Sequence, residues 1–558
     1  MSFADPQVAP QFIRQQFQDR AGVEVLEIST RAYPDELNYI VFVAEADVAA
    51  GAVIGNELDD ELARSGSRAF VIVRKAPESL VAEAAGKPVK LGVHDPRAND
   101  LLRLISARSR VSIAQPSLAY VKDAQANLSV VTAARHHLIF GRRGAGKTAL
   151  LVEARRQAEE EGSLTCWSNI QSLRQETPHR VVLYVLEELL ATLVSRQRHV
   201  RAESVVATDA AALFETVRNM LASRTTHPED VTALVPRVQR ALRRYLDTEG
   251  TRFYIYLDDF YYIARDLQPL VLDMLHGCVR DCDAWLKVAS IRHLTRWFQS
   301  SPPLGLQTIH DAELIDLDVT LQEPKRAKQF LESVLLQYAK RVGVARLASI
   351  FSGEALDRLV LASGAVPRDY LVLASSAILK AQGRAKARLV GVQNVNQAAG
   401  DAAGAKLQEL EDDMASNVDT AEKTLAALKI VREFCLDERA HTYFLVSYRD
   451  KENAPATYNL LTDLMDLRLI HLIDSGVSEA HAAGQRSEAF MLDLSQYSGA
   501  RLKQRIHMLD FSGGRMISRL THTSEPPRVG DTPRQVIAIL RTAPRLELSR
   551  LDGVLTEA

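Results

Sequence analysis

The chain has 558 residues, enough for roughly three or four domains that each bury a core. Its 47% hydrophobic and 25% charged content are typical of an ordinary soluble globular protein, and a formal net charge of -2 gives no global attraction to nucleic acid. The four cysteines are too few and too scattered for a disulfide framework or a zinc module; they are Cys166, Cys278, Cys282 and Cys435. No signal peptide is predicted, and the longest apolar run, 181–194, contains two glutamates. These features predict a cytoplasmic protein without membrane contact.

The first 112 residues are predicted to form a small α/β domain. The expected elements are a helix over 10–20, strands over 23–29 and 39–44, a polar helix around 56–64 and a strand over 70–73. This part of the sequence contains no nucleophile beside a base, no metal-ligand cluster and no glycine fingerprint. We therefore interpret it as a recruitment or sensor module rather than a second enzyme.

A glycine-rich loop between a strand and a helix lies in the second predicted domain, residues 113–322. The apolar run 138–140 leads into the loop Gly141-Arg142-Arg143-Gly144-Ala145-Gly146-Lys147-Thr148, and an apolar helix continues from Ala149. Glycines let backbone N–H groups converge on phosphate oxygens at the positive end of the helix dipole. Lys147 would then reach the β- and γ-phosphates, and Thr148 would place its hydroxyl on Mg²⁺. The alternative is a glycine-rich turn without a ligand. We predict that ATP and Mg²⁺ bind here, with Tyr120 as a further nucleotide contact.

Two aspartates follow a second buried strand, 253–258. Paired acids at the end of an apolar strand, downstream of a phosphate loop, belong at the carboxyl edge of a parallel sheet, where such sheets bind ligands. Asp258 is predicted to hold Mg²⁺, and Asp259 to orient or deprotonate the attacking water. A helix cap or a solvated turn is the alternative for such a pair alone. A long helical insertion, from 178 to about 245, separates this strand from the preceding one.

Arginines at two later positions are candidates for sensing phosphate. A third strand, 285–291, ends in Ser290-Ile291-Arg292. An arginine that closes an apolar strand is favourable there only with an anionic partner such as the γ-phosphate. The alternative is a surface salt bridge. The last strand, 312–321, leads into a helical lid over 323–410. Arg368 lies in the first turn of a lid helix, where a cation opposes the helix dipole. It either reaches back to the nucleotide or contacts a nearby acid such as Asp369. Within the lid, 382–386 and 398–404 are expected to be exposed connections.

The pattern from 411 to 500 predicts a winged helix, with helices over 421–435 and 457–467 and strands over 470–473 and 489–494. The candidate recognition helix carries Asp463 and Asp466, which would repel a phosphate backbone. Residues 501–558 form a basic extension, since 501–550 holds ten basic against four acidic residues. Interrupted by prolines and glycines, much of it is expected to be a tail.

With these residues in view, the chain resembles AAA+ P-loop ATPases, at the border of the origin-recognition and replication initiators and the STAND signalling ATPases. The resemblance covers about 118–497 and rests on the phosphate loop, Leu257-Asp258-Asp259-Phe260, Ser290-Ile291-Arg292-His293 and Gly364-Ala365-Val366-Pro367-Arg368-Asp369. It implies a parallel-sheet ATPase domain with a helical lid and a winged helix. It also implies that Asp258 and Asp259 form the Walker B pair, that Arg292, with Ser290, is the first sensor, and that Arg368 is the second.

Two departures from the family pattern matter. Typical hydrolases place Glu where this chain has Asp259, so a shorter carboxylate predicts slow turnover. The strand end with Ser290 and then Arg292 is more similar to STAND proteins than to initiators. No arginine that acts on a neighbouring subunit is assigned, and Arg296 is a candidate.

Three functions follow as hypotheses. The first is a slowly hydrolysing ATP/ADP switch in a signalling or defence-type assembly, with protein partners on the N-terminal and winged-helix domains and a homo-oligomer or larger complex as its working form. The second is an initiator or loader that grips duplex DNA without sequence preference, through Arg486 and the 501–550 arginines. The third is a structural ATP-binding protein that does not hydrolyse.

Overall fold

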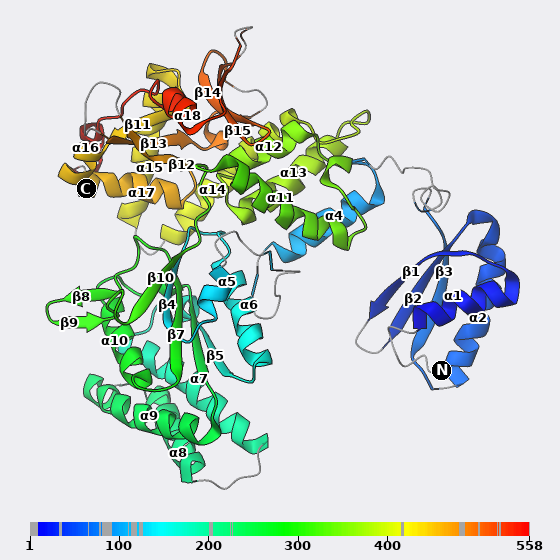
Figure 1. Cartoon of the computed structure of the whole chain (residues 1–558), viewed down its shortest axis with the longest axis horizontal. Helices are drawn as coiled ribbons and strands as arrows, with labels where there is room; N and C mark the ends of the chain where they lie inside the picture. The colour runs from blue at the N-terminus through cyan, green and yellow to red at the C-terminus, as the bar shows by residue number, and fades with distance from the viewer. Residues whose placement is uncertain are drawn as a thin grey trace. The chain divides into compact units, whose positions relative to one another are not determined.

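The computed structural model describes residues 9–32, 36–64, 66–77, 80, 92–109, 111–112, 120–121, 127–199, 205–223, 225, 227–414, 418–478, 486–499, 503–521, 523 and 526–556 (Figure 1). The chain divides into two compact units, Met1–Gly92 and Val93–Ala558. Helix α4 (Pro96–Arg108), which the sequence assigned to the first domain, lies in the second unit. Its Leu101 and Ile105 are fully buried in the same core as the lid, so the unit boundary falls before this helix rather than at 112.

Among its described residues, the first unit has a three-stranded sheet and two α-helices. Its elements are α1 (Ala9–Ala21), β1 (Val25–Ala32), β2 (Leu37–Val43), α2 (Val48–Arg64) and β3 (Ala69–Lys75). The central strand β2 pairs antiparallel with β1 and parallel with β3. Helix α2 begins well before the predicted residue 56 because Gly51 and Gly55 face β3 closely. A Cβ on either glycine would lie 3.2 or 3.0 Å from the side chain of Val73.

The second unit begins with α4 and continues into a parallel-sheet core, residues 127–316. A five-stranded parallel sheet runs in the order β10-β4-β7-β6-β5. Its strands are β4 (His136–Phe140), β5 (Leu164–Asn169), β6 (Phe253–Asp258), β7 (Ala284–Ser290) and β10 (Ala312–Asp316). The helices are α5 (Asn127–Val131), α6 (Lys147–Glu160), α7 (Pro178–His199), α8 (Val205–Ala222), α9 (Pro228–Glu249) and α10 (Gln268–Val279), and β8 (Phe298–Ser300) and β9 (Pro303–Gly305) form a hairpin. The predicted parallel-sheet fold is confirmed.

Both faces of this sheet are buried because successive strand residues point to opposite sides. In β6, Tyr254 and Tyr256 pack in the cluster that contains residues of α5 and α6. Phe253, Ile255 and Leu257 pack in the cluster formed with α7 to α10. The helical insertion therefore completes one layer of the core.

The lid, residues 324–414, comprises α11 (Pro324–Arg341), α12 (Gly353–Ala362), α13 (Pro367–Gln382) and α14 (Val392–Met414). The expectation of an exposed connection at 398–404 is wrong, since this segment lies inside α14 and Ala398 and Ala399 are buried. Small residues serve close packing here. A Cβ on Gly400 would lie 2.7 Å from Cα of Gly499.

In the C-terminal domain, residues 418–556, the two helices and two strands predicted for a winged helix occur in the expected order, but a strand over 443–447 and a short helix over 448–453 lie between the helices and were not predicted. Further strands and helices follow them. The elements are α15 (Val418–Glu433), β11 (Tyr443–Ser447), α16 (Tyr448–Asn453), α17 (Pro455–Asp466), β12 (Ile470–Ser478), β13 (Arg486–Leu492), β14 (His507–Ser512), β15 (Arg515–Leu520), β16 (Arg528–Gly530), α18 (Pro533–Leu540) and α19 (Asp552–Thr556). Strands β11, β13 and β12 form one antiparallel sheet, and β14, β15 and β16 form another.

The predicted C-terminal tail is folded over most of its length. Its apolar residues, such as Met508, Leu540 and Leu551, are buried in the core of the domain. Several of its arginines are paired: Arg515 with Asp531 at 3.1 Å, and Arg519 with Asp510 at 2.9 Å. Proline and glycine mark turns between short strands here, not the end of the fold.

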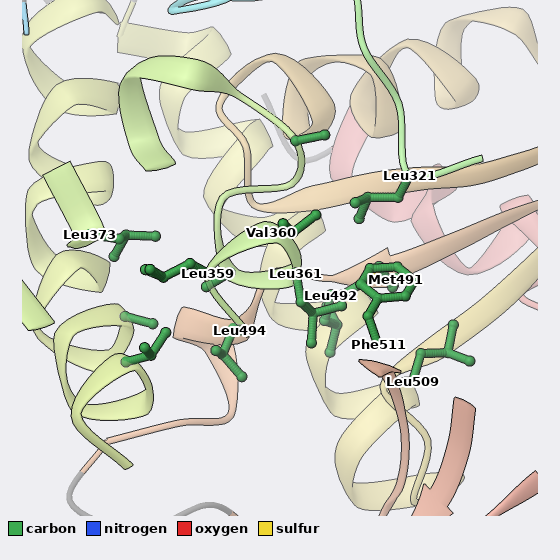
Figure 2. Packing of buried hydrophobic residues seen from close by; sticks show 14 of the residues in the cluster. Leu321, Leu359, Val360, Leu361, Leu373, Met491, Leu492, Leu494, Leu509 and Phe511 are labelled. Atoms are coloured by element: carbon green, nitrogen blue, oxygen red, sulfur yellow. The ribbon is translucent and has the colours of Figure 1, made fainter. Parts of the chain in front are cut away.

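The lid and the C-terminal domain share one hydrophobic core. Leu359, Val360 and Leu361 of α12 belong to the same cluster of buried residues as Met491 and Leu492 of β13 and Leu509 and Phe511 of β14 (Figure 2). Arg358 on the same helix is 2% exposed and donates to Asp510 of β14. The two parts are therefore joined by apolar packing and by a buried ion pair. Among the described residues, no helix is long and apolar enough to cross a bilayer.

Candidate nucleotide site

The phosphate loop joins β4 to α6 at the carboxyl edge of the sheet. Gly144 and Gly146 have φ of 81° and 103°, a left-handed backbone conformation that residues with a Cβ rarely adopt. Gly146 is the N-cap of α6, which begins at Lys147. The loop thus aims the positive end of the α6 dipole at the space above the sheet, as anion binding requires.

Lys147, Thr148 and Asp258 come together at this edge. Lys147 is 6% exposed, and its ammonium donates to the backbone carbonyls of Gly141 at 2.7 Å and Arg142 at 3.2 Å. The hydroxyl of Thr148 donates to Oδ2 of Asp258 at 2.8 Å. The strand order thus unites residues that are far apart in the sequence, as the two motifs predicted.

Burial sets the electrostatics of the pair of aspartates. Burial, and next the charge of Asp259, raise the pKa of Asp258 to about 6. Burial also raises the pKa of Asp259, opposed by the charges of Lys147 and Arg143, and burial lowers the pKa of Lys147. Asp259 has a left-handed backbone with φ of 56°. The acids and Lys147 are therefore partly desolvated charges that a phosphate and a cation would balance.

A cavity of about 790 Å³ opens over these residues, within the size range of ligand pockets. One part is polar and contains the phosphate loop, Asp258, Asp259 and Arg368. Another part is apolar and suits a flat base. Its walls are Val111, Tyr120, Val319, Phe330, Val334, Tyr338 and Leu371. Gly144 to Ala149 and Tyr120 all line the cavity, as predicted, whereas Gly141 contributes only its carbonyl to Lys147.

The predicted cofactor contact Arg142 has a different position. Its backbone N–H donates to Asp318 at 2.8 Å, and its guanidinium donates to the carbonyls of Val319 at 3.0 Å and Gly364 at 3.2 Å. Arg142 does not line the cavity that the described residues form. Because Gly364 belongs to the lid, this side chain connects the phosphate loop to the lid instead of to phosphate.

Arg368, which was expected either to reach the nucleotide or to contact a nearby acid, lies at the cavity. It lies in the first turn of α13 and lines the cavity, and its backbone N–H donates to the carbonyl of Gly144 at 3.4 Å. A Cβ on Gly144 would approach Cβ of Arg368 to 2.9 Å. The absence of a side chain at Gly144 is therefore what lets the lid touch the phosphate loop.

Two predicted sensor residues lie elsewhere. Ser290 is fully buried and its hydroxyl bonds to that of Thr295 at 2.6 Å, which closes the loop after β7. Arg292 is exposed, and its guanidinium lies 3.7 Å from Asp316 at the end of β10. Neither residue is among the described residues that line the cavity. Of the two alternatives for Arg292, the structure therefore supports the surface salt bridge. Arg296 is also exposed, and its backbone N–H donates to Gln268 at 2.7 Å.

The residues fit Mg²⁺ only together with a nucleotide. Thr148 and Asp258 offer oxygen ligands, which Mg²⁺ prefers. No group of three or more His, Cys, Asp or Glu side chains able to hold a metal occurs in the described part of the chain. The remaining ligands would be phosphate oxygens and water, as is usual for Mg²⁺ in nucleotide sites.

Sequence reasoning missed several residues of this site. Trp167, Asn169 and Gln171 line the cavity from β5 and the turn after it. Asn169 is paired in register with Asp258, so a polar residue ending the neighbouring parallel strand was the available signal. Asp318 lies just beyond the end of β10 in the same way, and holds Arg142.

The phosphate loop and both aspartates lie within a segment that matches a known domain family. Residues 122–284 match the AAA ATPase domain family. Among solved structures, the Aeropyrum pernix Orc1 protein in complex with DNA has 14% identity, covering 67% of this chain and 90% of its own, with a TM-score of 0.34. Pyrobaculum aerophilum Cdc6p has 12% identity over 64% of this chain and 85% of its own, with a TM-score of 0.28. Brucella abortus NtrX has 14% identity over 65% of this chain and 68% of its own, with a TM-score of 0.28. No curated protein matches the chain. With its strand–loop–helix phosphate site and paired aspartates, the segment 122–284 is an AAA ATPase domain of the AAA+ P-loop class.

Proposed function

We propose that the protein binds ATP with Mg²⁺, hydrolyses it slowly and acts as a nucleotide-dependent conformational switch in a signalling or defence-type assembly. The observation that carries this proposal is the double wall of the cavity. Lys147, Thr148 and Asp258 line it from the core, and Arg368 and Leu371 line it from the lid. A ligand that differs by one phosphate therefore meets groups on two separate parts of the chain.

The lid transmits its position to the C-terminal domain. A ligand shifts a conformational equilibrium only through a difference in affinity for the two states. Lys147 and Arg368 supply that difference if the γ-phosphate contacts both. Because the lid shares its core with the C-terminal domain, a lid that follows the phosphate carries that domain with it. Arg292 has no part in this arrangement, since it faces Asp316.

The chemistry assigned to the aspartates is ordinary ATP hydrolysis. Asp259 would orient a water and accept its proton as the water attacks the γ-phosphate and the bond to the leaving ADP breaks, with the Lys147 ammonium on the phosphate oxygens. Thr148 and Asp258 would hold Mg²⁺, which would supply further positive charge there. Asp259 has one methylene less than glutamate, which leaves its carboxylate further from that water. Slow turnover suits a switch, whose states must persist.

Sizing the full chain with ATP, with ADP and without nucleotide tests the switch. We expect the ATP and ADP samples to differ in hydrodynamic size or in oligomeric state. Lys147→Ala should remove that difference, and Lys340→Ala, at an exposed lid position, should retain it. Equal sizes for wild type in all three conditions would contradict the proposal. Protein partners would bind the first unit or the C-terminal domain, and a homo-oligomer would appear directly in the same measurement.

Hydrolysis is tested separately by steady-state phosphate release. Asp259→Asn should abolish release and keep ATP binding, which would set aside a purely structural ATP-binding role. Asp281→Asn is a matched control, because Asp281 is exposed and has nearly the same backbone, with φ of 57° against 56° for Asp259. Release from wild type no faster than from Asp259→Asn would favour the structural role instead.

A DNA-binding initiator is the second candidate, and the charges of the C-terminal domain speak against it. Asp463 and Asp466 of α17 lie on the helix that would enter DNA, and arginines of the last segment pair with acids, as Arg550 does with Glu438 at 2.9 Å. Binding to a duplex of random sequence at several salt concentrations, with and without ATP, separates the candidates. Tight binding whose affinity falls steeply with salt would favour the initiator.

A further inference from the structure

The end of α17 touches the loop that follows β7 of the core. Asp463 and Asp466 are three residues apart and therefore share one face of the helix. Nε2 of His293 lies 2.6 Å from Oδ2 of Asp466 and 3.7 Å from Oδ1 of Asp463. The Asp466 side chain is 15% exposed, and its Oδ2 accepts no hydrogen bond from the described residues. A contact this short between a carboxyl group and an imidazole is favourable only if the pair holds a proton.

Two further contacts join the same end of α17 to the lid. Arg468, with a left-handed φ of 60°, donates to Asp369 at 2.7 Å, and their side chains are 4% and 11% exposed. His471 packs against Gly364 so closely that a Cβ there would lie 2.1 Å from the imidazole. Asp369 directly follows Arg368, which lines the cavity. The segment from the end of α17 to the start of β12 thus contacts the core at His293 and the lid at Gly364 and Asp369.

We propose that Asp466 and His293 form a proton-controlled latch, which holds the C-terminal domain against the core when the pair carries one proton and releases it when that proton is lost. The latch deepens the proposed function, on which it rests, by adding proton concentration as an input to the nucleotide switch.

The groups around the pair determine its charge preference. Asp318 after β10 and Asp463 on α17 add negative charge near Asp466, and Arg142 and Arg143 of the phosphate loop add positive charge. Arg265, in the turn before α10, and Arg143 oppose protonation of His293. Burial dominates for both members, raising the pKa of Asp466 to about 8 and lowering the pKa of His293 to about 4. Burial also raises the pKa of Asp463 to about 6. The closed pair therefore keeps one proton, mainly on Asp466.

The pH range of release follows from the open state, in which the two groups have ordinary pKa values of 3.8 for Asp466 and 6.5 for His293. Between pH 4 and 6.5 the open pair also carries one proton, on His293, so closing takes up no proton. Above pH 6.5 the open pair loses the proton on His293, so the pair must take up a proton when it closes. This uptake ends near pH 8, where the closed pair also loses its proton. The closed-to-open ratio should therefore fall about tenfold per pH unit between 6.5 and 8, because one proton is linked to closure.

Energy transfer between two dyes on the full chain measures closure. The dyes are attached at Ser300→Cys in the core and Glu452→Cys in the C-terminal domain, both exposed positions, in a Cys282→Ser background, because the other three native cysteines are buried. We expect transfer in the nucleotide-free protein to fall as pH rises from 6.5 to 8. Asp466→Asn, which resembles the protonated acid, should keep transfer high and independent of pH. Asp247→Asn, at an exposed site on α9, is the control and should follow wild type.

The outcomes separate the latch from the switch. A wild-type signal that is flat from pH 6 to 8.5, or an Asp466→Asn signal that follows wild type, overturns the latch. Loss of the pH response in Asp466→Asn with unchanged melting supports it. A pH response that persists while ATP and ADP give the same transfer contradicts the nucleotide switch and leaves the latch standing.

Discussion

Removing one member of the buried pair Arg468–Asp369 is the most demanding test of how the C-terminal domain is attached. The two side chains are 4% and 11% exposed, and their closest atoms lie 2.7 Å apart. Arg468→Met keeps most of the volume but leaves the Asp369 carboxylate buried without its partner. Breaking such a pair costs about 3–5 kcal/mol, whereas replacing both members by apolar groups is about neutral. We therefore expect Arg468→Met and Asp369→Leu each to be strongly destabilising, and the double variant to recover most of the loss.

Urea unfolding of the four proteins, completing a double-mutant cycle, measures this coupling. The transition should be followed by a probe in the C-terminal domain, because a chain of several domains does not unfold in two states. A matched exposed pair, Arg515 and Asp531 at 3.1 Å, should show a coupling of about 1 kcal/mol or less. If the single variants at 468 and 369 lose less than about 1 kcal/mol each, the pair is not desolvated in solution and the reasoning about this interface is wrong.

Four further substitutions address the nucleotide site and the lid. Lys147→Ala should abolish detectable ATP and ADP binding in a fluorescent-nucleotide titration, and retained binding would remove the phosphate loop as the site. Arg368→Ala should weaken ATP binding roughly tenfold more than ADP binding, which is the loss expected for one charged contact. Arg292→Ala should leave both affinities unchanged. A loss of ATP affinity in Arg292→Ala larger than that in Arg368→Ala would show that Arg292 turns into the cavity. Gly364→Ala should lower the thermal midpoint of the C-terminal domain, because the added methyl would lie 2.1 Å from His471, and an unchanged midpoint would mean that the two do not pack together.

The phosphate site was predictable because its parts are fixed by local sequence and by the rule that parallel strands end at one edge. The glycine loop needs only its neighbouring strand and helix, and Asp258 needs only to end a strand of the same sheet. The contact between Thr148 and Asp258 followed from those two facts. Arg368 was also found from local reasoning, since a cation in the first turn of α13 is unfavourable without an anion.

Contacts between distant segments could not be predicted in the same way. Arg292 follows an apolar strand, so an anionic partner was expected for its guanidinium. The sequence did not show that this partner would be Asp316 rather than the phosphate. Ala398 to Gly404 were assigned to a linker because small residues are frequent in connections. They lie in α14, where Gly400 closely approaches the backbone at Gly499, a contact that exists only once the domains have folded together. The acids of α17 were expected to be unsuited to DNA, but their partner His293, which lies far away in the sequence, was not predicted.

The single apolar interior of the lid and the C-terminal domain has a consequence for stability. Helices α11 and α13 present Phe330 and Leu371 to the nucleotide cavity while both residues also pack in that interior. A nucleotide that binds only the native arrangement must therefore protect the distant strands β14 and β15 against melting, by an amount that grows with the logarithm of its concentration. By the same linkage, weakening those strands would cost nucleotide affinity without touching any residue of the cavity.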